Sequence, residues 1–302
     1  MLIESIQKEF LADKKYEGLK RNSLVAYETF FKNWNQWLHK QNIEHLEDLN
    51  PRLSKQYLRD CVEKGNNAGT HNTKLKLLRS FSKWLVEEGI VKEMLTQNIK
   101  AQKEDHKPKI VSTDDLKLVL STLRRNRRRD DTFTSRRNYA LILFLTGTGL
   151  RIKELERLTW ADVDFQDSLI RINESKSRKQ QSVPLSEALA REILDWRLFL
   201  ERKFEKVPLS LFVTEKGEPF SRNGIQNFFK RLKKKLGIKS DFSPHALRAY
   251  FIKELLKNGS NLREVQLLAR HSKITVTQLY IGYFAHELKD SLDTNNPLND
   301  LI

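Results

Sequence analysis

Six polar residues in the C-terminal two-thirds of the chain have the types and spacing needed for one reactive site. Four of them fall within a window of 36 residues, and two lie upstream of it. The set contains two guanidinium groups, two imidazoles, an ammonium group and a phenol, without a cluster of carboxylates or cysteines. This composition favours metal-free chemistry on an anionic substrate. The residues are Arg151, Lys176, His245, Arg248, His271 and Tyr280.

The chemistry that suits these groups is attack of a tyrosine on a phosphodiester. Negative charge grows on the non-bridging oxygens as the pentavalent state forms, and a guanidinium group meets two such oxygens in a planar fork. Two guanidinium groups can therefore take the place of a divalent metal ion. A tyrosine with its ordinary pKa of about 10 needs this electrophilic help. The leaving 5′ oxygen needs a proton from a positioned acid, and the product is a 3′-phosphotyrosine ester that a 5′-hydroxyl reseals without ATP.

Four segments resemble those of the tyrosine recombinases, the phage-integrase and Xer-type group. Residues 146–155 (TGTGLRIKEL) resemble the first-arginine segment of that family, and residues 243–248 (SPHALR) resemble its His-x-x-Arg segment. Residues 271–280 (HSKITVTQLY) resemble the last segment, with the spacing from histidine to tyrosine intact. Lys176, in residues 174–179 (ESKSRK), resembles the lysine of the family's strand–turn–strand unit.

The resemblance implies a mainly α fold with a small antiparallel β-sheet (α+β). We expect an N-terminal helical core-DNA-binding domain at 1–100, a linker at 101–109 and a catalytic domain at 110–288. The apolar residues of the tail at 289–302 indicate either docking on a neighbouring protomer or, as the alternative, a frayed terminus. The implied activity is site-specific recombination of double-stranded DNA by four protomers through a four-way junction, without metal or cofactor. Accessory DNA-bending proteins are possible partners.

The resemblance also implies a role for each residue. Arg151 and Arg248 hold the scissile phosphate, His245 and His271 contact it or share proton transfer, and Tyr280 attacks it. Lys176 is the expected acid for the leaving oxygen. Two choices stay open. The neighbours Arg178 and Lys179 compete with Lys176, and Tyr283 is an alternative nucleophile.

Two positions depart from the family pattern. The residue before His271 is usually glycine, whereas this chain has Arg270, and the residue after Arg248 is often histidine, whereas this chain has Ala249. Arg270 adds a charge beside the expected site. Glu154, three residues after Arg151, is a candidate for orienting an arginine.

The composition is consistent with a DNA partner. The chain has 302 residues, a formal charge of +16 and a pI near 9.7, and so basic a balance indicates a polyanion. The apolar run at 139–145 is far shorter than the ~20 residues that span a bilayer, so no membrane partner is expected. Cys61 is the only cysteine, and no secretory signal is visible at residues 1–10. We therefore expect a cytoplasmic, nucleoid-associated protein.

The surrounding pattern predicts the elements that position these groups. Apolar residues at steps of three and four predict helices through the first hundred residues, one of them capped by Asn22 or Ser23 and others after Pro51 and Thr70.

Beyond the expected linker, Ser112 or Thr113 is expected to cap a helix. Residues 139–145 are expected to form a buried helix that ends at the glycines before Arg151. Strands are expected at 169–172 and 181–184, with 211–214 as a third candidate. Pro244 after Ser243 predicts a helix start.

Some alternatives stay open from the sequence. The basic run at 124–129 either contacts phosphates or forms a mobile charged loop. A type IB topoisomerase uses the same chemistry, and a DNA-binding regulator without catalysis is a rival from another class. A metal-dependent nuclease is disfavoured because the sequence offers no suitably spaced ligand cluster.

Overall fold

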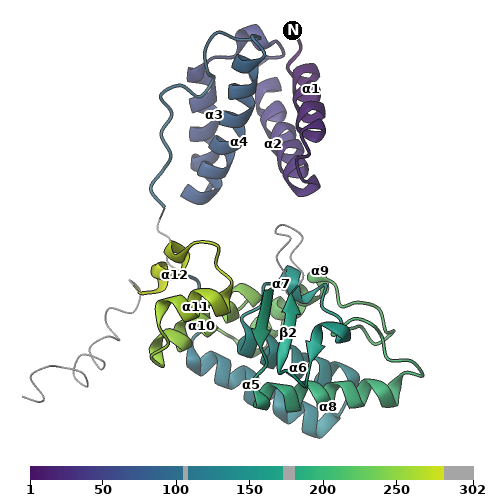
Figure 1. Cartoon of the computed structure of the whole chain (residues 1–302). Coiled ribbons are helices and arrows are strands. Elements are labelled where there is room, and N and C mark those ends of the chain that lie inside the picture. The colour runs from purple at the N-terminus through teal and green to yellow at the C-terminus, as the bar shows by residue number, and fades with distance from the viewer. Residues whose placement is uncertain (105–107, 173–180, 282–302) are drawn as a thin grey trace, which may run out of the picture. The chain divides into compact units, whose positions relative to one another are not determined.

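The chain folds into two compact units, Met1–Asp105 and His106–Ile302. The computed structural model describes residues 1–104, 108–172 and 181–281 (Figure 1). The helical content is high and the single described sheet is small, so the expected fold class of helices with a small antiparallel sheet is confirmed. None of the described helices combines the length and hydropathy needed to cross a bilayer. The domain boundaries expected at 100, 109 and 288 stay predictions.

The N-terminal unit is a helical bundle whose core is aromatic. The ring of Phe10 meets four other rings edge to face, at centroid distances of 5.0 to 5.9 Å. They are those of Tyr27, Phe31, Phe81 and Trp84. Such a core holds the helices in fixed positions because aromatic rings bury large areas with specific geometry. The helices are α1 (Ile3–Tyr16), α2 (Arg21–His39), the 3-10 turn η1 (Leu46–Asp48), α3 (Pro51–Glu63) and α4 (Ala68–Glu87).

Two helix starts in this unit differ from the sequence prediction. The predicted cap of α2 at Asn22 or Ser23 is wrong, because the helix begins at Arg21 and both residues already lie in its first turn. Helix α4 begins two residues before Thr70, since the side chain of Asn67 accepts a hydrogen bond from the Thr70 amide. The helix predicted after Pro51 is α3, which begins at Pro51 itself.

The C-terminal unit places a three-stranded antiparallel sheet among helices (Figure 1). Strands β2 and β3 pair in the predicted ranges, with Ile170 opposite Val183. The third strand is β1, which pairs with β2. The prediction of a strand at 211–214 is wrong, because this segment forms only an isolated bridge from Val213 to Pro219.

The elements of this unit are α5 (Thr113–Asp130), α6 (Phe133–Thr148), α7 (Ile152–Leu155), η2 (Trp160–Asp162), β1 (Val163–Asp164), β2 (Leu169–Ile172), β3 (Gln181–Pro184), α8 (Glu187–Lys203), α9 (Arg222–Leu236), α10 (Pro244–Lys257), α11 (Leu262–Ala269) and α12 (Ile274–Ile281).

Helix α6 is the centre of the C-terminal unit. It is buried on nearly every side, packs against α5, α8 and α10, and contributes Leu141, Phe144 and Leu145 to the core. The helix passes through Gly147 and ends at Thr148, with Gly149 in the left-handed conformation as its C-cap. The chain therefore turns sharply just before Arg151.

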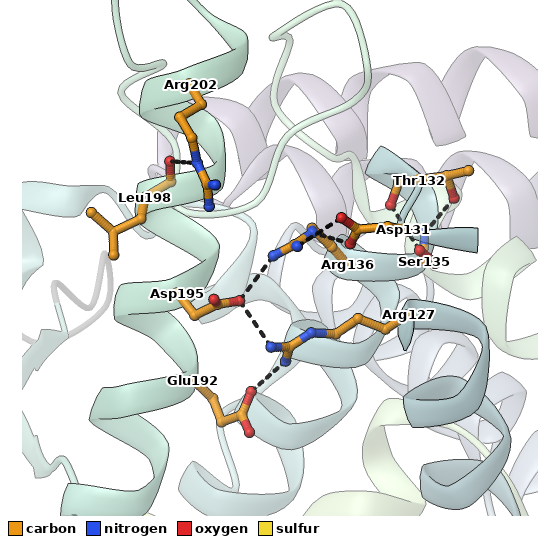
Figure 2. A network of polar contacts seen from close by, with 9 residues as sticks. All are labelled: Arg127, Asp131, Thr132, Ser135, Arg136, Glu192, Asp195, Leu198 and Arg202. Atoms are coloured by element: carbon orange, nitrogen blue, oxygen red, sulfur yellow. Dashed lines mark hydrogen bonds and ion pairs between the residues drawn. The ribbon is translucent and has the colours of Figure 1, made fainter. Parts of the chain in front are cut away.

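The basic run at 124–129 is helical and belongs to the last turns of α5, so the predicted mobile loop is wrong. Arg127 donates to Glu192 at 2.6 Å and pairs with Asp195 at 3.1 Å, both on α8 (Figure 2). Arg136 on α6 reaches the same Asp195 at 3.2 Å. Part of this run therefore fastens α5 and α6 to α8.

Candidate active site

Arg151 stands at the start of α7, directly after the turn that ends α6. Glu154 fixes it from two sides, because one carboxylate oxygen accepts from the Arg151 amide at 2.8 Å and the other from its Nη1 at 2.7 Å. Arg151 Nη2 donates to the carbonyl oxygen of Arg270 at 2.9 Å. The Arg151 side chain is 40% exposed, so solvent reaches part of a guanidinium group that Glu154 and the Arg270 carbonyl hold in place.

Arg248 lies on α10 and is almost fully buried. Its Nη1 donates to the carbonyl oxygen of Gly149 at 2.7 Å, and its Nη2 donates to that of Ala269. Burial, followed by the charges of Arg151 and Arg270, lowers the pKa of Arg248 to about 9, so the group keeps its proton at neutral pH. A charge held here with neutral carbonyl partners favours the approach of an anion.

His245 lies one turn before Arg248, at the start of α10. The side chain of Ser243 caps this helix by accepting from the Ala246 amide at 3.1 Å, and Pro244 follows in the first turn, as predicted. His245 itself is exposed. Desolvation by the protein, then the charges of Arg248 and Arg151, lowers the pKa of His245, so its neutral form is favoured.

His271 lies in the segment between α11 and α12. Its Nδ1 is 2.8 Å from the hydroxyl oxygen of the fully buried Thr277, and its ring lies nearly parallel to that of Tyr280, with centroids 6.5 Å apart. Burial and the nearby charges of Arg248 and Arg151 lower the pKa of His271 to about 4. His271 is therefore neutral at physiological pH.

Tyr280 is on α12 and is buried, with 6% of its surface exposed. It belongs to a small apolar cluster that includes Ala249, Ile252 and Ala269. Burial raises the pKa of the Tyr280 phenol, and Arg248 opposes this rise. Ala249, one of the two departures from the family pattern, is thus part of the packing around the tyrosine.

The described site unites five of the six predicted side chains, from α7, α10, α12 and the segment after α11. Lys176 and its competitors Arg178 and Lys179 lie outside the described residues, as does Tyr283. The structure places Glu154 beside Arg151, as its spacing suggested.

Four described contributors were not predicted. The hydroxyl of Thr277 contacts His271, and backbone carbonyl oxygens hold the two arginines. These groups give no sequence signal, because each acts through tertiary contacts. The carbonyls are those of Gly149, Ala269 and Arg270.

Known proteins resemble this chain along most of its length. Residues 110–286 match the phage integrase family, and residues 8–89 match the N-terminal SAM-like domain of phage integrases. The chain is 32% identical to the tyrosine recombinase XerC of Bacillus licheniformis over 294 residues, which is 94% of this chain and 91% of that protein. It is 28% identical to the tyrosine recombinase XerD of Staphylococcus aureus over 299 residues, with 98% and 99% covered.

A solved structure shares the fold. The Tn1549 transposon integrase in complex with transposon right end DNA superimposes with a TM-score of 0.76 at 21% identity, covering 93% of this chain and 95% of that one. The family match spans more than half of the chain, and together with the 32% identity to a curated relative it shows that the chain belongs to the phage integrase family.

Proposed function

We propose that this protein cuts and rejoins DNA with Tyr280 as the nucleophile and Arg151 and Arg248 as the phosphate clamp. The chain is a tyrosine-type site-specific DNA recombinase. The observation that carries the residue roles is the pair of consecutive carbonyls at 269 and 270, each of which holds one of the two arginines beside the tyrosine helix. Two cations fixed in this way suit the two non-bridging oxygens of one phosphodiester.

The proposed reaction follows from these positions. Tyr280 Oη attacks the phosphorus, the phosphotyrosine bond forms, and the bond to the 5′ oxygen breaks. The phenol proton passes to a neutral imidazole or to water, since the lowered pKa values of His245 and His271 favour the unprotonated form of both rings. The two arginines oppose the charge that develops on the phosphoryl oxygens, and the 5′ oxygen takes a proton from Lys176.

Several further assignments belong to the proposal. The partner is double-stranded DNA at specific sites, which the charge of +16 supports. Four protomers assemble on two duplexes, with accessory bending proteins as possible additional partners, and the protein acts in the cytoplasm at the nucleoid. The tail at 289–302, which lies outside the described residues, is proposed to dock on a neighbouring protomer. Exposed apolar side chains on α11 and α12, such as Leu267 and Leu279, support a protein contact there.

A covalent-adduct assay tests the reaction. The protein is incubated in chelator with duplexes whose central sequence is randomised and which carry nicks that trap the cleaved state. Detergent-stable complexes are isolated, and their DNA is sequenced. We expect an adduct with wild type and with the control Tyr250→Phe, and none with Tyr280→Phe.

Each other outcome has a defined meaning. Loss of the adduct only in Tyr283→Phe moves the nucleophile and keeps the class. Absence of any wild-type adduct across the library contradicts the proposed cleavage. Relaxation of plasmids without sequence preference contradicts site specificity and favours a topoisomerase.

A further inference from the structure

Arg270 is a buried cation directly behind the candidate site. Only 2% of its side chain is exposed, although arginine is rarely buried without a partner. The residue is the C-cap of α11 and adopts φ 54°, ψ 49°, a left-handed conformation that glycine adopts more easily. A long charged side chain in a strained and buried position indicates a contact that offsets its cost.

That contact is with Glu154. Arg270 Nη2 lies 3.0 Å from Glu154 Oε2, and its Nη1 donates to the carbonyl oxygen of Leu268 at 2.9 Å. The Glu154 side chain is only 8% exposed. Its other oxygen, Oε1, holds Arg151 Nη1 at 2.7 Å. Glu154 is therefore a bridge between a buried arginine and the exposed arginine of the clamp.

The backbone of Arg270 completes the connection. Its carbonyl oxygen accepts from Arg151 Nη2, and the preceding carbonyl, that of Ala269, accepts from Arg248. Arg270 thus supports Arg151 in two ways: its carbonyl oxygen accepts a hydrogen bond from Arg151, and its side chain binds Glu154, which also binds Arg151. A shift of Arg270 would move these two described supports of the Arg151 guanidinium group.

The Arg270 guanidinium changes the net charge of the cluster that faces the phosphate. Among the described residues of this cluster, Arg151, Arg248 and Arg270 contribute three positive charges and Glu154 one negative charge, which leaves a net +2 for these four. Without Arg270 the carboxylate would be offset by Arg151, and the net charge would fall to +1. A pentavalent phosphorane carries more negative charge than the ground-state diester. Loss of one positive charge would therefore destabilise the transition state more than the bound DNA.

We propose that Arg270 is a positioning residue for the strand-cleavage reaction. It neutralises and fixes Glu154, and so leaves the charge of Arg151 available for the scissile phosphate. This inference rests on the proposed function, because it concerns the rate of the same cleavage step.

The test uses three variants of the full chain, Arg270→Gly, Glu154→Gln and the double variant. Glycine suits the left-handed backbone, so Arg270→Gly removes the side chain without adding strain. Glutamine keeps an oxygen acceptor for Arg151 but removes the charge that Arg270 neutralises. Each variant is compared with wild type in a single-turnover adduct assay on the duplex selected by the wild-type protein, alongside its affinity for that duplex and its thermal unfolding.

We expect Arg270→Gly to slow adduct formation roughly tenfold to a hundredfold, with DNA affinity changed by less than about threefold. In the Glu154→Gln background the same change is expected to have an effect of less than about threefold, because no carboxylate is left to neutralise. The acid limb of the rate profile should also move to higher pH in Arg270→Gly, since Arg270 contributes to the lowered pKa of Glu154 and His271. The other titratable groups facing this cluster are Arg151, Arg248, His245 and Tyr280.

The outcomes separate this inference from the proposed function. No adduct with wild type overturns both. A wild-type adduct with an Arg270→Gly rate within twofold overturns the positioning role alone, as does an equal slowing in both backgrounds. If Arg270→Gly does not fold, the double variant is compared with Glu154→Gln, and a tenfold difference between them contradicts the neutralisation of Glu154.

Discussion

Arg248 Nη1 donates to the carbonyl oxygen of Gly149 over 2.7 Å, although the two residues are 99 positions apart in the sequence. The glycine ends α6 two residues before Arg151, and the arginine lies on α10. The turn that ends α6 therefore leads into Arg151 and also accepts a hydrogen bond from Arg248. The geometry of the clamp depends on this turn as much as on the arginines themselves.

Gly149→Ala is expected to damage both stability and cleavage. Gly149 has φ +58°, and an added Cβ would overlap Cδ1 of Phe251. We expect backbone strain and overpacking to lower the free energy of unfolding by about 2 to 4 kcal/mol. The shifted carbonyl of Gly149 should also slow adduct formation. Urea unfolding and the adduct assay measure the two effects.

Gly237→Ala is the matched control for this change. Gly237 caps α9 with φ +63°, but an added Cβ meets no heavy atom within 4 Å. We expect a loss of about 1 kcal/mol from strain alone, and an unchanged cleavage rate. Equal losses in the two alanine variants would contradict the role assigned to the Phe251 contact.

Arg151→Ala is expected to abolish most cleavage and keep binding. Its side chain is 40% exposed and held by Glu154 and the Arg270 carbonyl, so its removal takes away half of the clamp. We expect adduct formation to fall by at least about a hundredfold, or roughly 3 kcal/mol, and the affinity for duplex DNA to change little. The exposed Arg157→Ala is the control for loss of one positive charge. A near wild-type rate in Arg151→Ala would remove Arg151 from the clamp.

Much of the fold was visible in the sequence because local signals agreed with the tertiary structure. Ser112, one of the two predicted caps, caps α5, and α10 begins at Pro244 as predicted. Strands β2 and β3 occupy the predicted ranges. The errors arose where a tertiary contact decided the outcome. Arg127 belongs to a basic run for which a mobile loop was predicted. Its ion-pair partners Glu192 and Asp195 lie 65 or more positions away on α8, so the sequence around Arg127 gives no sign of them.

The site shows the same division. Spacing brought His245 and Arg248 together because one helix carries both. Nothing local shows that Ala269 and Arg270 support two arginines with consecutive carbonyls, since backbone atoms are the same for every residue type. Arg270 stood out only as a departure from a glycine, and its ion pair with Glu154 required the fold.

His271 is expected to make stability depend on pH. Its pKa is about 4 in the folded chain and about 6.5 when unfolded, so the unfolded chain binds the proton first as the pH falls. The stabilisation is complete above about pH 7 and is lost between pH 6.5 and 4. From pH 7 to pH 5 we expect a loss of about 2 kcal/mol from this group. Urea unfolding of wild type and His271→Gln at both pH values measures it. A loss of equal size in the glutamine variant would assign the pH dependence to other groups.

Arg127→Ala is expected to weaken the attachment of α5 to α8 and leave DNA binding intact. Arg127 pairs with Glu192 and Asp195, and these partly exposed ion pairs contribute about 1 kcal/mol. The neighbouring Arg125 is exposed, so Arg125→Ala should change stability by less than about 0.5 kcal/mol. Thermal unfolding compares the two variants. The salt dependence of duplex binding should be unchanged by Arg127→Ala, and a reduced slope would show that Arg127 contacts phosphate.

Lys176→Ala is expected to lose cleavage of ordinary DNA and recover it on a modified substrate. In the proposed reaction the lysine protonates the leaving 5′ oxygen, and without it an alkoxide must depart. Replacement of that oxygen by sulfur removes the need for an acid, because a thiolate leaves without a proton. The adduct rate on the two substrates is the measurement, with Arg151→Ala as a control that sulfur should not rescue, since the clamp acts on the non-bridging oxygens. If Lys176→Ala stays inactive on the sulfur substrate while Arg178→Ala or Lys179→Ala recovers, the acid is that neighbour and not Lys176.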